Sequence, residues 1–176
     1  MSAETEPASY KSTDVVLLRE IVTSAEARLQ AQLTASLAAD QRALVLAGFL
    51  LAVIVALGGA AAALLLKDPK QLFLGYTAFG CAVGLLVALS LTVYAARPVD
   101  WSYPATRPGA WIKDIAAKKA EKIRLAEMAA DAHLKIDDNA TLMRSNGKCV
   151  NVALWIAIGT LVIGAILAAC FFACQS

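Results

Sequence analysis

A run of 24 residues without a charge, a proline or an amide side chain extends over Ala43–Leu66. A helix of this length rises about 36 Å at ~1.5 Å per residue, whereas the hydrocarbon core of a bilayer is ~30 Å thick. The run is therefore long enough to span a bilayer and too long for an ordinary core helix. Because the charges stop at Arg42, we expect the triplet that begins at Asp40 to mark the passage of a helix from water into lipid.

Two further uncharged runs, Leu72–Ala96 and Val150–Ala173, have similar lengths, and all five prolines lie outside the three runs. The composition agrees, because 59% hydrophobic and 17% charged residues fall outside the range of soluble domains. The sequence therefore predicts an all-α integral membrane protein. Its three transmembrane helices are expected at residues 43–66, 72–96 and 150–173, with two cytoplasmic helices outside them.

The distribution of basic residues predicts the orientation. Four lysines or arginines precede the first run, two lie between the first and the second, and ten lie between the second and the third. An excess of Lys and Arg marks the cytoplasmic side. By fourteen to two, the amino terminus and residues 97–149 are expected in the cytoplasm, with the loop Lys67–Lys70 and the carboxyl terminus outside.

The region before the first run divides into a polar tail, residues 1–12, expected to be disordered, and an amphipathic helix, residues 13–42. Its apolar stripe has three interpretations: packing on the chain's own second cytoplasmic helix, a coiled-coil seam between protomers, or a helix lying on the membrane. The mixed charges of its polar face argue against the last. Whether this helix continues unbroken into the first span stays open. The stripe consists of Leu18, Val22, Ala25, Leu29, Leu33 and Leu37.

The long cytoplasmic region begins with an irregular segment, Arg97–Trp111, since three prolines and Gly109 oppose a helix. Its aromatic side chains, among them Trp101, suit the headgroup zone of a membrane. A single helix is expected from Ile112 to about Met143. A break or bend is expected at Asn146-Gly147-Lys148.

The second run contains a GxxxG pattern, Gly80 and Gly84. Small residues let helix backbones approach closely in lipid. These glycines are candidates for packing the hairpin of the first two spans, with contacts between copies as the alternative.

The sequence lacks the residues that several classes of function require. The spans carry no charged side chain, which argues against a transporter or a proton pump. The single histidine, His133, has no metal-ligand partner at a suitable spacing, and no nucleotide-binding or hydrolase motif is present. We therefore expect no enzyme activity, no catalytic residue, no metal and no cofactor. The basic residues between Lys118 and Arg124 alternate with acidic ones, so a solvated helix face is expected there rather than a nucleic-acid site.

The order of features resembles the transmembrane effector module of bacterial cyclic-nucleotide immunity (the Pycsar effector type) and, more loosely, SLATT-like membrane domains. The resemblance is carried by the junction Ala39–Ala43, by Ala96-Arg97-Pro98 after the second span, and by polar residues before the third span. The usual aromatic-glycine pair is replaced here by Pro108-Gly109-Ala110-Trp111. The polar residues are Asn139, Asn146 and Lys148.

The resemblance implies a homo-oligomeric protein of the bacterial inner membrane that disrupts the bilayer on a nucleotide signal, with a cyclic nucleotide as a possible ligand. The alternative function is a non-enzymatic accessory or scaffold subunit of a membrane protein complex. Candidate residues for coupling a cytoplasmic event to the spans are Asp40, Arg42, Arg97, Trp101, Trp111 and Lys148.

Overall fold

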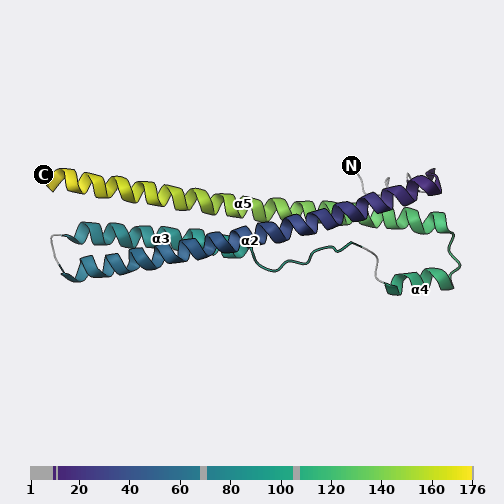
Figure 1. Cartoon of the computed structure of the whole chain (residues 1–176), viewed down its shortest axis with the longest axis horizontal. Coiled ribbons are helices and arrows are strands. Elements are labelled where there is room, and N and C mark those ends of the chain that lie inside the picture. The colour runs from purple at the N-terminus through teal and green to yellow at the C-terminus, as the bar shows by residue number, and fades with distance from the viewer. Residues whose placement is uncertain (1–9, 11, 68–70, 105–107, 176) are drawn as a thin grey trace. The chain divides into compact units, whose positions relative to one another are not determined.

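The structure, a computed structural model, describes residue 10 and residues 12–67, 71–104 and 108–175. Within these ranges it is helical and has no strand. Most of the predicted disordered tail, residues 1–12, and most of the loop Lys67–Lys70 lie outside the described residues. The helices are α2 (Val15–Lys67), α3 (Leu72–Ala95), α4 (Pro108–Ala116) and α5 (Glu121–Gln175), shown in Figure 1.

Helices α2, α3 and α5 are long and apolar enough to cross a membrane. This confirms the prediction of three helices of span length. Helix α2 is continuous over 53 residues, about 80 Å at ~1.5 Å per residue, which answers the question that the sequence left open. No proline interrupts it, so the backbone N–H groups after the first turn can keep their acceptors one turn earlier.

The chain divides into two compact units. We call Met1–Leu37 with Val99–Met143 the helix-pair unit, and residues 38–98 with residues 144–176 the three-helix unit. Helices α2 and α5 contribute residues to both.

In the helix-pair unit, α2 and α5 run parallel. Arg19 of α2 forms an ion pair with Glu121 of α5, and Leu29 packs against Ala132 and Ile136 in the core. The numbering thus increases in the same direction along both helices. Of the three interpretations of the apolar stripe, the structure supports packing on a helix of the same chain.

The buried positions of α2 in this unit, Leu18, Val22, Leu29 and Ser36, lie four or seven residues apart, as in a heptad repeat. The end of the predicted stripe was wrong: Leu37 is 57% exposed, whereas Ser36 is 3% exposed. Residues in the seam between two packed helices repeat every 3.5 positions on average. The last residues of the predicted apolar stripe were instead spaced four apart. The seam therefore continues from Leu29 to Ser36 instead of Leu37.

The predicted single helix from Ile112 to Met143 is two helices. Helix α4 ends at Ala116, and Lys118 adopts a left-handed conformation with φ 49°. The backbone N–H of Lys118 bonds the carbonyl of Ile115 at 3.1 Å, and that of Lys119 bonds Asp114 at 3.1 Å. These two bonds form a Schellman C-cap, which usually takes glycine at the left-handed position.

Side chains support the same turn. The Lys119 ammonium pairs with Glu127 and lies 3.7 Å from Asp114. The hydrogen bond to Glu127, with the nearby charge of Asp114, raises the pKa of Lys119.

Two expected irregularities were also wrong. Helix α4 begins at Pro108 and includes Gly109, Ala110 and Trp111, because proline is tolerated at the first position of a helix. Helix α5 passes through Asn146–Lys148 without a break. Gly147 costs the helix about 1 kcal/mol, less than the unpaired backbone groups of a break would cost.

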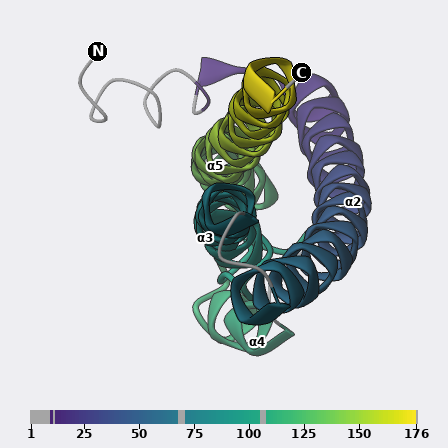
Figure 2. The same cartoon turned by 90° about the vertical axis from the view of Figure 1, so that its left-hand side faces the viewer.

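In the three-helix unit, α3 packs against both long helices. The core contains Leu50 of α2, Leu85 and Ala88 of α3, and Ala153 and Ala157 of α5. Figure 2 shows α3 beside α5 and beside the end of α2. The small residues at this core bring the three backbones close together.

Candidate functional site

The contact between Asn139 and Ser102 is the most specific polar interaction of the helix-pair unit. Asn139 lies on α5 and is 1% exposed. Its Oδ1 accepts the backbone N–H of Ser102 at 3.1 Å, and its Nδ2 donates to the Ser102 carbonyl at 3.0 Å. One side chain thereby satisfies both backbone groups of a residue in the irregular stretch before α4, and holds that stretch on α5.

A polar layer surrounds this level of the α2–α5 seam. Gln32 of α2 donates from Nε2 to the carbonyl of Ile136 at 3.1 Å, and Ser36 donates to Leu33 at 2.9 Å. The Oε1 atom of Gln32 is buried without a hydrogen-bond partner among the described residues. A polar layer in an apolar seam lowers stability but favours one register of the two helices.

The sequence-based list of coupling residues omitted Asn139, although the resemblance included it. The signal was present in the pattern, since Asn139 continues the spacing of the buried residues Ala132 and Ile136 on α5. A polar residue at a seam position indicates a partner that satisfies it.

In the three-helix unit, α3 and α5 meet at small residues. A Cβ atom at Gly84 would lie 2.7 Å from Oγ1 and 2.8 Å from Cγ2 of Thr160, and one at Gly164 would overlap Sγ of Cys81. The Cys81 thiol donates to the carbonyl of Thr160 at 3.7 Å. Gly84 thus packs against α5 rather than within the α2–α3 hairpin. At Gly80 an added Cβ would meet no atom within 4 Å.

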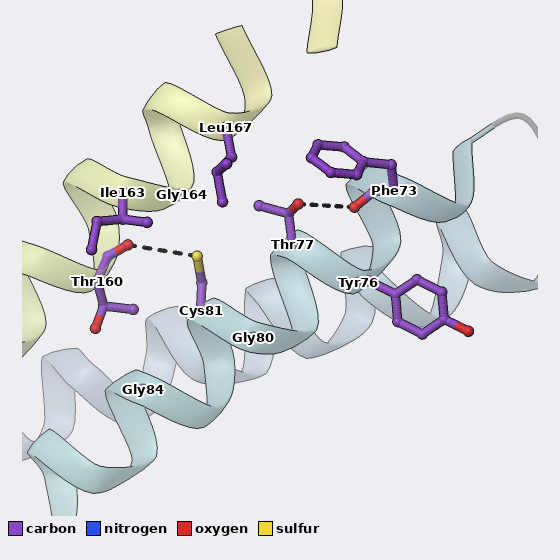
Figure 3. A pocket seen from close by; sticks show the side chains of 10 residues that line it. All are labelled: Phe73, Tyr76, Thr77, Gly80, Cys81, Gly84, Thr160, Ile163, Gly164 and Leu167. Carbon is purple, nitrogen blue, oxygen red and sulfur yellow. Dashed lines mark hydrogen bonds between the residues drawn. The ribbon is translucent and has the colours of Figure 1, made fainter. Parts of the chain in front are cut away.

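A groove of about 420 Å³ lies along this contact. Figure 3 shows the aromatic rings of Phe73 and Tyr76 at one end and the small residues Gly80 and Gly84 at the other. The Thr77 hydroxyl, which faces the groove, donates to its own helix at the Phe73 carbonyl, 2.9 Å away. The lining is mostly apolar and carries no Asp, Glu, Lys, Arg or His. Such a surface can hold an apolar group.

The predicted coupling residues lie in different parts of the chain. Arg42, Arg97 and Lys148 are exposed residues of the three-helix unit, and the Arg97 guanidinium lies 4.1 Å from the ring centroid of Tyr94. Asp40, in the same unit, is half-buried, and burial raises the pKa of its carboxyl.

The two candidate tryptophans belong to the irregular segment predicted before the long cytoplasmic helix. Trp101 is half-buried and precedes Ser102, the residue that Asn139 holds. Trp111 lies within α4, and its side chain is outside the described part of the chain.

Among the residues that the structure describes, no group of three His, Cys, Asp or Glu side chains could hold a metal ion. Comparisons with protein-family models, with curated proteins and with solved structures found no match.

Proposed function

We propose that this chain is a homo-oligomeric protein of the bacterial inner membrane that perturbs the bilayer when a cytoplasmic signal reaches it. The observation that carries the proposal is the exposure of the three helices of span length. In their most apolar windows, only 11%, 17% and 6% of the residues of α2, α3 and α5 are buried. In this proposal, lipid and further copies of the chain cover the rest.

Open glycines support assembly of several copies. Five glycines of the predicted spans would carry a Cβ without meeting any atom within 4 Å. Each glycine destabilises a helix by about 1 kcal/mol relative to alanine. At none of the five does a close contact with another described helix of the same chain offset this cost. Close approach by a helix of another copy would use them. They are Gly48, Gly58, Gly59, Gly80 and Gly159.

The orientation in this proposal follows from the distribution of basic residues, which predicts that the helix-pair unit is cytoplasmic. There it would receive the signal, and α2 and α5 would carry it into the spans because both helices continue through Arg42 and Lys148 without a break. A ligand shifts such an equilibrium by binding one arrangement more tightly than the other. On the resemblance alone, we propose a cyclic nucleotide as the signal.

The proposal is tested by inducing the full-length chain in bacteria with and without a co-expressed nucleotide cyclase, while a potential-sensitive dye reports the membrane potential. We expect depolarisation only when both are present. Asp40→Ala serves as the paired variant: we expect it to insert normally and to change assembly or depolarisation. An unchanged membrane potential at saturating signal would reject the effector function.

One observation favours the alternative, an accessory or scaffold subunit. Helix α4 exposes Ile112 by 68% and Ile115 by 65%, and these residues, three apart, share one face of the helix. A partner subunit could cover that face. Purification in mild detergent distinguishes the two functions, since a stoichiometric second protein supports the accessory subunit and a homo-oligomer supports the effector.

A further inference from the structure

Each helix of the three-helix unit carries an exposed cation where its apolar segment meets the polar chain. Arg42 precedes the uncharged run of α2, Arg97 follows the end of α3, and Lys148 precedes the uncharged run of α5. A buried alanine lies within five residues of each cation. These alanines are Ala43 at 3%, Ala95 at 2% and Ala153 at 0% exposure.

The contacts between the helices place the three cations at one level. Helix α3 is antiparallel to α2, and Gly75 of α3 faces Leu65 of α2. Moving 22 residues forward from Gly75 reaches Arg97, and moving 22 residues back from Leu65 reaches Ala43. Along the axes of the helices, Arg97 therefore lies at about the same height as Ala43, the residue that follows Arg42.

The same count applies to α3 and α5, where Gly84 faces Thr160. Moving 13 residues forward from Gly84 again reaches Arg97, and moving 13 residues back from Thr160 reaches Gly147, the neighbour of Lys148. The stacked rings of Phe73 and Phe171, 5.4 Å apart, give the same register. Contacts in the core extend toward this end of the unit, since Leu50 packs in the same cluster as Ala88 and Ala153.

The charge of these cations is not neutralised by the described carboxylates. None of the three forms an ion pair with a described Asp or Glu, including Asp40 and Asp100, which are near them in the chain. Arg97 contacts the ring of Tyr94 through its guanidinium plane, which leaves its N–H groups for another acceptor. Exposed Arg144, one turn before Lys148, adds a fourth positive charge.

We infer that Arg42, Arg97 and Lys148 bind phosphate headgroups of anionic phospholipids at this end of the three-helix unit. Three cations at one level, directly beside apolar helix surface, match a ligand that combines a phosphate with acyl chains. The inference rests on the membrane placement in the proposed function and is independent of the effector activity.

The test uses the purified full-length chain in nanodiscs made from equal amounts of phosphatidylglycerol and phosphatidylcholine, followed by native mass spectrometry of the retained lipids. We expect about tenfold preference for phosphatidylglycerol. The triple variant R42Q/R97Q/K148Q should lose this preference, and the charge-retaining variant R42K/R97K should keep it.

The matched control, R28Q/K118Q/K122Q, removes three cations of the helix-pair unit, so its net charge equals that of the triple variant. Equal loss of preference in this control would overturn the site in favour of a general charge effect. An unchanged preference in the triple variant would also overturn it. Displacement of the lipid by inorganic phosphate would assign the site to free phosphate instead of a lipid. Entry into nanodiscs and circular dichroism report insertion and folding separately, so failure of the membrane placement is distinguishable from failure of this site.

Discussion

The side-chain amide of Asn139 forms one hydrogen bond with the N–H and one with the carbonyl of Ser102, at 3.1 and 3.0 Å. Because Asn139 is buried in α5, this pair ties the irregular stretch after α3 to the α2–α5 seam. A shorter or apolar side chain leaves both backbone groups of Ser102 without these partners.

Asn139→Ala should therefore destabilise the helix-pair unit by about 2 kcal/mol, the cost of buried polar groups left unpaired. The protection of the Ser102 amide in hydrogen exchange should fall at the same time. Asn146→Ala, on the same helix and without a described side-chain hydrogen bond, is the matched control. Equal stability of the parent and Asn139→Ala would show that the contact contributes nothing.

Gly84→Ala should weaken the contact of α3 with α5 by about 1–3 kcal/mol, because its Cβ would overlap the Thr160 side chain. Thermal unfolding in detergent measures the change. In a Thr160→Ala background, which removes the overlapping Oγ1 and Cγ2, the same substitution should be nearly neutral. Gly80→Ala has open space around it and should be tolerated in both backgrounds. Indistinguishable effects at Gly80 and Gly84 would contradict the packing described.

Lys118→Gly should stabilise the turn between α4 and α5 by about 0.5–1 kcal/mol, since glycine adopts the left-handed conformation without the clash of a Cβ. Denaturant unfolding of the full chain, with hydrogen exchange at Lys119, measures it. Ala117→Gly, one residue earlier and without a positive φ, should not stabilise the turn. A destabilised Lys118→Gly variant would be inconsistent with this cap.

Asp40 should contribute a small pH dependence. Its pKa is raised in the folded chain by burial, so the folded state binds a proton more tightly than the unfolded state. The stability from this group is complete below its ordinary pKa of 3.8 and is lost as the pH rises through the raised value. Asp40→Asn should therefore have a higher unfolding temperature than the parent at pH 7, and the two should converge in acid. A parent more stable than Asp40→Asn at pH 7 would mean that the carboxylate has a stabilising partner.

The sequence was sufficient to predict the features that depend on local pattern alone. Uncharged runs located the three helices of span length, and the stripe from Leu18 to Leu29 identified the face of α2 that packs. Ser36 is buried in the seam instead of Leu37 because two packed helices supercoil around each other. The sequence of one helix alone does not reveal this supercoil. The left-handed Lys118 could not be anticipated either, because the preference for glycine at that position is strong but not absolute.

The candidate sites were predictable only in part for a related reason. A GxxxG pattern indicates where backbones can approach, but the helix that approaches is set by the fold. A Cβ at Gly84 would meet Thr160, whereas a Cβ at Gly80 would meet no described atom of another helix within 4 Å. Likewise Arg42, Arg97 and Lys148 lie far apart in the sequence, and only the register of the three helices makes them level.

In the proposed topology, the chain crosses the membrane three times and the helix-pair unit lies inside the cell. Single-cysteine variants test this directly with a membrane-impermeant maleimide on intact bacteria: one keeps only Cys174 near the end of α5, and the other carries only Ser24→Cys on the exposed side of α2. We predict labelling of Cys174 in intact cells and labelling of Ser24→Cys only after permeabilisation. Labelling of both positions in intact cells, or of Ser24→Cys alone, would contradict this topology.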